Sequence, residues 1–215
     1  MITDYRLRIT ETSNPKSAIR NLQSYMNQII TISGDPGSGK STIARELAKK
    51  LKAKRIYVGE IRREIARKKG LTLAELNNYA EKHPETDIDI DKDVANQARQ
   101  LAKKYPVIVE GRTQFHFIPE SFKLYVKVSL TEGAKRIWRQ MQSQKAKSAR
   151  NEGQINSLAG LKKTILKRIA SDKKRYKKYY GLDHTKKSHY DLVVDTTKIT
   201  AKQAIAKILQ NLSKT

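Results

Sequence analysis

A glycine-rich stretch that begins at residue 34 constrains this chain more than any other feature. Residues 34–41 read Gly-Asp-Pro-Gly-Ser-Gly-Lys-Ser and fit the pattern G-x-x-x-x-G-K-[ST]. An apolar, β-branched run at 29–33 comes before it, and Ile43, Leu47 and Leu51 follow it at helical spacing. This order of strand, glycine loop and helix indicates a phosphate-binding loop, because glycines let successive N–H groups turn towards an anion.

The chemistry of such a loop predicts a role for each of its residues. Lys40 is expected to reach the β- and γ-phosphates of a nucleotide, and the Ser41 hydroxyl is expected to bind Mg²⁺. The N-terminus of the following helix adds its positive dipole end to the same site. The residues expected to hold the polyphosphate are Gly34, Asp35, Pro36, Gly37, Ser38, Gly39, Lys40, Ser41 and Thr42.

Four further apolar segments predict strands, and they alternate with segments of helical pattern. The strands are expected near residues 55–58, 107–112, 124–130 and 190–195. The helices are expected near residues 42–51, 60–69, 73–82, 91–104 and 200–212, with helical ends also in the basic segment 134–180. This pattern predicts an α/β fold of the P-loop NTPase type, with a five-stranded parallel sheet between two helical layers. The loop, Gly59, Glu110 and Ser129 all fall at strand carboxyl ends, where such folds bind ligands.

Composition favours one compact domain in a reducing compartment. The chain has 215 residues and no cysteine, so it forms no disulfide and no thiolate metal site. No apolar run approaches the roughly 18 residues of a membrane span, and the first residues do not read as a signal peptide. We expect a soluble, cytoplasmic, monomeric protein that does not bind membranes.

The net charge of +24 allows two interpretations. It either attracts nucleic acid or gives a lysine-rich surface to an enzyme with anionic substrates. The lysines are spread over the predicted helices, and no stacking aromatic residues accompany them in the pattern of an RNA-binding module. We favour the second interpretation and expect no specific nucleic-acid binding, although the charge is compatible with non-specific binding.

Five spaced stretches together resemble the cytidylate kinases, in particular the short form typical of archaea. They are residues 59–64, 83–85 with Asp87 and Asp91, 109–112, 171–183 and 190–196, and the similarity covers about residues 28–210. The resemblance implies transfer of the γ-phosphate of ATP to CMP or dCMP, which gives CDP or dCDP, with Mg²⁺ as cofactor. It also implies a kinase domain at 28–215 with an NMP-binding segment at about 59–104 and a lid at about 136–165, preceded by an N-terminal extension at 1–27.

The resemblance further implies a second, arginine-rich site beside the loop. Its expected substrate-binding residues are Arg63, Arg112, Arg168, Asp172 and Arg175, of which the last three share one helix face through their spacing. The lid arginine that clamps the transferring phosphoryl group is expected to be Arg136, with Arg139 as second candidate. Glu110 is expected to join Ser41 in placing Mg²⁺, through water. The residues predicted to be catalytic are Lys40, Arg112, Arg136, Arg168 and Arg175.

Departures from the family pattern leave the acceptor base open. Family members often place a glycine soon after Glu-Gly-Arg, where this chain has the residues 113–117, and Gln140 replaces an expected second lid arginine. Residues 141–157 look like an insertion, and their polar part at 143–157 is expected to be a mobile lid. The alternatives are a kinase of AMP or UMP, an RNA-associated P-loop NTPase, and a binding module without catalysis.

Overall fold

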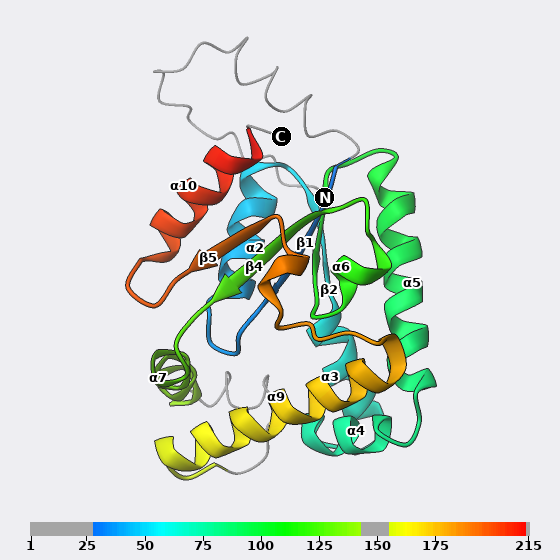
Figure 1. Ribbon diagram of the computed structural model, residues 1–215, viewed down its shortest axis with the longest axis vertical. Coiled ribbons are helices and arrows are strands. Elements are labelled where there is room, and N and C mark those ends of the chain that lie inside the picture. The colour runs from blue at the N-terminus through cyan, green and yellow to red at the C-terminus, as the bar shows by residue number, and fades with distance from the viewer. Residues whose placement is uncertain (1–27, 143–154, 214–215) are drawn as a thin grey trace, which may run out of the picture.

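The computed structural model describes residues 28–142 and 155–213, and a parallel β-sheet forms its centre (Figure 1). The sheet has five strands in the order β2-β3-β1-β4-β5, and every neighbouring pair is parallel. The fold class predicted from the sequence is therefore confirmed. The strands are β1 (Ile29–Gly34), β2 (Lys54–Tyr57), β3 (Val107–Glu110), β4 (Phe122–Lys127) and β5 (Leu192–Asp195).

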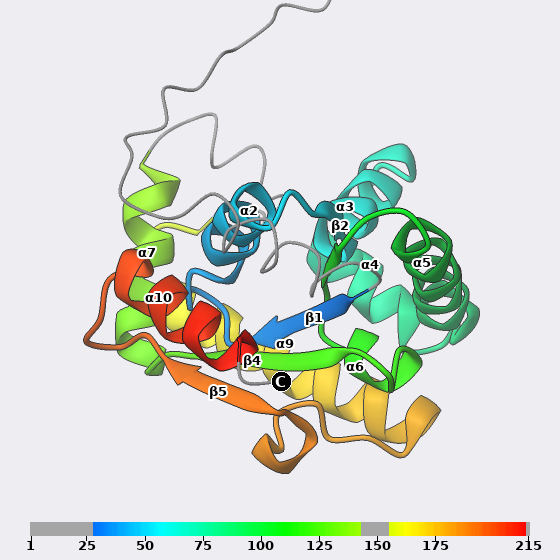
Figure 2. The same cartoon turned by 90° about the horizontal axis from the view of Figure 1, so that it is seen from above.

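Helices cover both faces of this sheet. In β3, Ile108 packs into the core on one face, whereas Val107 and Val109 pack into the core on the other. The first face is covered by α2 (Lys40–Lys50) and α10 (Ala201–Leu212), and the second by α5 (Glu85–Ala102). Figure 2 shows α2 and α10 on one side of the sheet and α5 with α6 (Gln114–Phe117) on the other. Because both faces are buried, every residue of the inner strands β1 and β3 is buried, and these strands are nearly continuous apolar runs.

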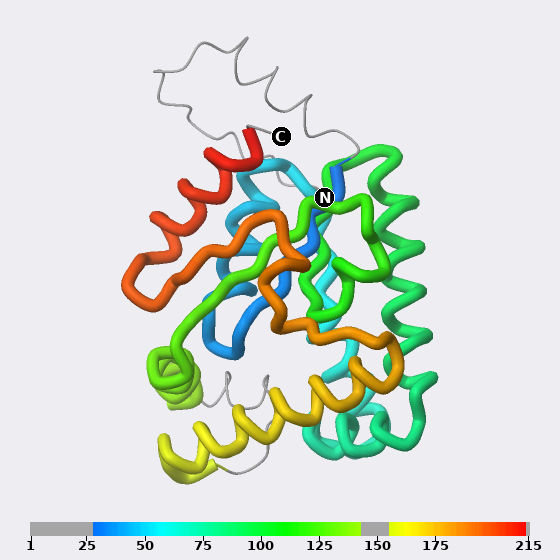
Figure 3. The backbone as a smooth tube through the Cα atoms, viewed as in Figure 1, coloured from blue at the N-terminus to red at the C-terminus, as the bar shows by residue number. Residues whose placement is uncertain are grey.

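Four helices lie beyond the carboxyl ends of the strands. They are α3 (Val58–Lys68), α4 (Leu73–Ala80), α7 (Leu130–Met141) and α9 (Leu158–Tyr180). The tube in Figure 3 shows that α9 passes beneath the sheet, from α7 at one end to α4 at the other. Apolar side chains of α7 and α9, including Ile137 and Leu161, form a separate small core. These helices lie opposite the sheet edge that carries the glycine loop. Side chains of α3, α7 and α9 therefore face the loop.

Capping residues fix where several helices begin. The predicted capping box of Thr72 and Glu75 is present at the start of α4. Thr200 and Gln203 form a second one at the start of α10, and the Ser157 side chain accepts a hydrogen bond from the Gly160 N–H at the start of α9. The first residues of these helices are therefore set by capping residues that can be recognised in the sequence.

The start of α5 differs from the prediction. A helix was expected from residue 91, yet α5 begins at Glu85, directly after Pro84. Asp87 and Asp91 lie one turn apart in α5 and are both buried. The first turns of the helix thus bury carboxylates instead of apolar side chains, and apolar periodicity gives no signal for them.

Some expectations fall on residues that the structure does not describe. The N-terminal extension at 1–27 and positions 143–154 of the expected mobile lid are among them. Two short elements were not predicted, namely α6 and a 3₁₀ turn at Lys187–His189. Of the helices that the structure describes, none combines the length and the apolar character needed to cross a bilayer.

Gly37 and Gly39 form a matched pair for testing how the glycine loop packs. Both have a positive φ, of 79° and 82°, which costs an alanine about 1–2 kcal/mol. A Cβ on Gly37 would lie 2.2 Å from the carbonyl oxygen of Gly133 in α7, whereas one on Gly39 would meet nothing within 4 Å. We expect Gly37→Ala to lower the free energy of unfolding more than Gly39→Ala in urea titrations. Equal losses would contradict the close approach of the loop to α7.

Candidate active site

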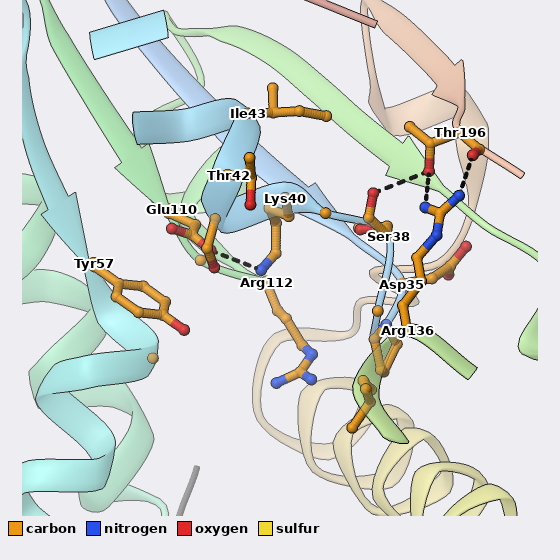
Figure 4. A pocket seen from close by; sticks show the side chains of 18 of the residues that line it. Asp35, Ser38, Lys40, Thr42, Ile43, Tyr57, Glu110, Arg112, Arg136 and Thr196 are labelled. Carbon is orange, nitrogen blue, oxygen red and sulfur yellow. Dashed lines mark hydrogen bonds and ion pairs between the residues drawn. The ribbon is translucent and has the colours of Figure 1, made fainter. Parts of the chain in front are cut away.

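A cleft of about 880 Å³ opens at the carboxyl edge of the sheet (Figure 4). The whole glycine loop, residues 34–42, lines it, together with residues from α3, α7, α9 and the segment after β3. It lies where the strand order reverses, because β1 is flanked by β3 on one side and β4 on the other. The fold therefore brings the predicted phosphate loop and most of the predicted arginines to one place.

Strand β4 and the residues after β5 anchor the glycine loop. The Tyr125 hydroxyl donates to Asp35 Oδ1 at 2.5 Å, and the Val128 N–H donates to Asp35 Oδ2 at 2.9 Å. The Thr196 hydroxyl donates to the carbonyl oxygen of Ser38 at 2.9 Å. The Asp35 carboxylate thus ties the loop to β4, so any contribution of Asp35 to phosphate binding comes from its backbone.

Glu110, the last residue of β3, is fully buried and binds Lys40 and Ser41, the two loop residues expected to contact phosphate and Mg²⁺. Lys40 Nζ lies 3.0 Å and Ser41 Oγ 2.5 Å from Glu110 Oε1, and the Arg55 guanidinium binds the other carboxylate oxygen. Burial alone would raise the pKa of Glu110, but Lys40, Ser41 and Arg55 together lower it below its ordinary value. Glu110 is therefore ionised and holds Lys40 at the mouth of the loop.

The Ser41 hydroxyl and the Glu110 carboxylate also fit the predicted Mg²⁺ site. Mg²⁺ takes oxygen ligands and is usually bound by one or two side chains together with phosphates and water. Two such oxygens lie side by side here, next to the loop. Among the described residues no group of three or more His, Cys, Asp and Glu side chains could hold a metal by itself. The donor set is therefore suited to a metal that arrives with a nucleotide.

The arginines expected in the second site divide into two groups. Arg63, Arg112, Arg136 and Arg168 line the cleft, whereas Arg175 does not. Arg112 Nε lies 3.1 Å from Asp172 Oδ2, and its side chain is 21% exposed. The guanidinium of Arg136 is bound by Glu132 at 2.9 Å and by the Thr196 carbonyl oxygen at 2.7 Å, as Figure 4 shows for Thr196.

Asp172 and Arg175 lie behind the wall of the cleft. Both side chains are 1% exposed, and neither lines the cleft. Arg175 pairs with Asp172 at 2.5 Å and with Asp87 of α5, and Asp87 in turn binds Arg62. The spacing along α9 did place these residues on one helix face with Arg168, but only Arg168 of the three lines the cleft, whereas Arg175 is buried against Asp87 of α5. Their assignment as direct substrate ligands stays a prediction, and their burial favours a part in holding Arg112.

The same buried pairs set the protonation of Asp172. Burial would raise the pKa of this carboxyl, yet Arg112, followed by Arg175 and Arg168, lowers it to about 2. Asp91, one helix turn after Asp87, shows the opposite effect, because burial raises its pKa to about 6 in spite of hydrogen bonds from Thr113 and Tyr180.

Sequence reasoning missed Tyr57, and it gave no role in the cleft to Arg62, Asp91 and Thr196, although these three lie in the stretches that carry the family resemblance. Tyr57 is the last residue of β2, and the Arg63 guanidinium donates to its hydroxyl at 2.9 Å. Burial would raise the pKa of Tyr57, but Arg63 and Lys40 lower it below its ordinary value. The only sequence signal for Tyr57 was its place at the carboxyl end of a predicted strand.

The sheet order and the glycine loop define a P-loop kinase-like fold, and comparisons with solved structures show the same fold. Shikimate kinase from Acinetobacter baumannii, in complex with shikimate, has a TM-score of 0.54 at 18% identity and covers 90% of this chain and 97% of that one. Shikimate kinase from Bacteroides thetaiotaomicron has a TM-score of 0.55 at 15% identity, with 87% and 97% covered. At these identities the likeness shows the fold alone.

Sequence comparisons identify the family. A family model described as an AAA domain matches residues 30–157. The cytidylate kinase of Methanosarcina mazei is 38% identical over 172 residues, 79% of this chain and 87% of that protein. The cytidylate kinase of Methanocella arvoryzae is 36% identical over 190 residues, 86% of this chain and 99% of that protein. The chain therefore belongs to the cytidylate kinase family, which confirms the resemblance found in the sequence.

The low pKa of Asp172 predicts a pH dependence of stability. Because the folded-state pKa of about 2 lies below the ordinary 3.8, the ionised carboxylate stabilises the fold above pH 3.8, and this is lost as the pH falls towards 2. The difference corresponds to about 2 kcal/mol. We expect Asp172→Asn to lower the free energy of unfolding at neutral pH, and the difference from wild type to shrink as the pH falls through this range.

Denaturant titrations at several pH values would measure this difference. The control is Asp93→Asn, because Asp93 is an exposed carboxylate on the surface of α5, where water screens its interactions. A difference between wild type and Asp172→Asn that does not change with pH would contradict the assigned pKa.

Proposed function

We propose that the protein transfers the γ-phosphate of ATP to CMP or dCMP, which gives ADP and CDP or dCDP. The observation that carries this proposal is the meeting of two kinds of phosphate ligand in one cleft. Lys40 and the loop amides suit the polyphosphate of a donor, and Arg63, Arg112 and Arg168 on other elements suit the phosphate of an acceptor. Membership of the cytidylate kinase family supports a CMP-type acceptor.

On the donor side, the loop amides and Lys40 would bind the β- and γ-phosphates. Lys40 is already oriented by Glu110, so its ammonium group needs little reorganisation when ATP binds. Ser41 and, through water, Glu110 would hold Mg²⁺, which neutralises charge on the phosphates when it is bound. Arg136 lines the cleft from α7 and, as the proposed lid arginine, would release its present contacts to reach the transferring group.

On the acceptor side, Arg63, Arg112 and Arg168 would bind the CMP phosphate and direct its oxygen at the γ-phosphorus. The planar guanidinium matches two phosphate oxygens at once, which fixes the direction of attack as well as the affinity. The phosphate oxygen of the acceptor attacks in line, the bond from the γ-phosphorus to the β–γ bridging oxygen breaks, and ADP leaves. No covalent intermediate with the protein is required.

Replacing Lys40 tests the donor side. We expect Lys40→Ala to lower kcat by at least about a hundredfold, because a charge-stabilising donor in a preorganised site contributes about 3–4 kcal/mol. The measurement is CMP-dependent ADP formation at saturating ATP. Lys50→Ala is the matched control, since Lys50 is an exposed lysine in the last turn of the same helix. Near-normal turnover of Lys40→Ala would contradict a kinase mechanism that uses this loop.

A panel of acceptors tests the acceptor side and the alternatives. We expect CMP and dCMP to stimulate ADP formation with a higher kcat/KM than UMP or AMP. The panel is measured with a coupled ADP assay, with a sample lacking acceptor and one containing RNA as references. A preference for AMP or UMP would assign another nucleoside monophosphate kinase. Stimulation by RNA in place of a mononucleotide would assign an RNA-associated NTPase.

A further inference from the structure

Tyr57 is a cleft residue to which the proposed reaction assigns no role, although its hydroxyl lies within reach of Ser41 and of the charge of Lys40 in the loop. It ends β2, and its Cα lies opposite that of Glu110 in the adjacent β3, which sets it at the carboxyl edge of the sheet. Figure 4 shows the phenol ring extending from that edge into the cleft, with Lys40 between Tyr57 and Arg136. The ring therefore stands on the side of the cleft away from Arg136, next to α3.

Tyr57 contacts Arg63 through both its hydroxyl and its ring. Arg63 Nη1 donates to Tyr57 Oη at 2.9 Å and to the carbonyl oxygen of Gly59 at 2.9 Å. The guanidinium carbon of Arg63 lies 5.6 Å from the centroid of the tyrosine ring, within the range of a cation–π contact. The Arg63 side chain is only 10% exposed, so these contacts fix a guanidinium that has little room to move.

The tyrosine ring is itself held rigidly. A Cβ on Gly59 would lie 2.7 Å from Tyr57 Cε2, so the ring packs directly on the backbone at the start of α3. The guanidinium carbon of Arg55 lies 4.7 Å from the ring centroid, and Arg55 is in turn bound by Glu110. The position of the Tyr57 hydroxyl is therefore tied to the same carboxylate that orients Lys40.

Uncharged groups take part in orienting Arg63, whereas buried carboxylates pair with the neighbouring arginines. Arg62 pairs with the buried Asp87, and Arg112 with the buried Asp172. Two hydrogen bonds of Arg63 end on uncharged oxygens, and the Glu60 carboxylate, which is about half exposed, lies 3.9 Å from its guanidinium. The phenol and the carbonyl oxygen thus help to set the direction of the guanidinium without adding negative charge of their own.

We propose that Tyr57 is a positioning residue for acceptor binding, which holds the Arg63 guanidinium, through its hydroxyl and ring, where it meets the acceptor phosphate. The inference rests on the proposed role of Arg63 as a ligand of that phosphate. Tyr57 acts through Arg63, so its contribution depends on the presence of that side chain. Because the phosphate is bound both before and during transfer, the contribution is expected in the KM for the acceptor more than in kcat.

A double-mutant cycle of Tyr57→Phe and Arg63→Ala tests this. Tyr57→Phe keeps the ring and removes only the hydroxyl, so thermal unfolding should change little. We expect it to raise the KM for CMP by about tenfold or more, because hydrogen bonds to charged groups are the stronger ones, and to change the KM for ATP much less. In the Arg63→Ala background the same substitution should have no further effect on the KM for CMP.

Tyr105→Phe is the matched control. Tyr105 is an exposed tyrosine before β3, outside the cleft, so the loss of its hydroxyl should leave both KM values unchanged. Calorimetric titration of CMP into each variant checks that the KM changes report binding.

Three outcomes would overturn the inference. The first is an unchanged KM for CMP in Tyr57→Phe. The second is that Tyr57→Phe raises the KM for CMP equally in the wild-type and the Arg63→Ala backgrounds. The third is that Tyr57→Phe raises the KM for ATP as much as the KM for CMP. Two other results point elsewhere. An Arg63→Ala enzyme with the wild-type KM for CMP would show that Arg63 does not bind the acceptor phosphate. A wild-type enzyme without CMP-dependent ADP formation would reject the proposed function itself.

Discussion

A buried carboxylate at the centre of the sheet edge is the constraint on which the rest of the site depends. Glu110 is 0% exposed, and its two oxygens are bonded by Lys40, Ser41 and Arg55. A buried charge is costly unless it is paired, and removing one partner of such a pair typically costs about 3–5 kcal/mol. The same pairing therefore joins α2, β2 and β3 and fixes the lysine of the glycine loop before any nucleotide binds, which is the preorganisation that phosphoryl transfer requires.

A second set of buried pairs joins the helices beyond the sheet. Asp87 in α5 binds Arg62 of α3 and Arg175 of α9, and Asp172 of α9 binds Arg175 and Arg112. Apolar packing also contributes, because Val58 of α3 and Val94 of α5 belong to one core and Tyr180 at the end of α9 packs against another. Charge pairing is directional where apolar packing is not, so it sets the position of Arg112 relative to α3 and α9.

Sequence reasoning predicted what depends on local pattern and missed what depends on distant partners. The strands, the glycine loop and the capping box at Thr72 follow from apolar runs and from neighbouring residues. The first turns of α5 were missed because Asp87 is buried by an arginine 88 residues away, which no periodicity reveals. The burial of Arg175 has the same cause, since spacing places residues on a helix face without showing what the face packs against. Tyr57 was missed because its function depends on Arg63 and Gly59 folding back over it.

These buried pairs help to explain how the net charge of +24 is distributed between the interior and the surface. Four of the 21 acidic residues, all in the described part of the chain, are buried around the cleft, namely Asp87, Asp91, Glu110 and Asp172. All of them except Asp91 pair with arginine or lysine, so these carboxylates screen little of the surface charge. A surface with so many lysines attracts any polyanion, and this attraction weakens with salt and does not select. Selection of a nucleotide must then come from groups held in fixed directions. The cleft supplies such groups where buried carboxylates, a phenol and carbonyl oxygens orient Lys40, Arg112 and Arg63.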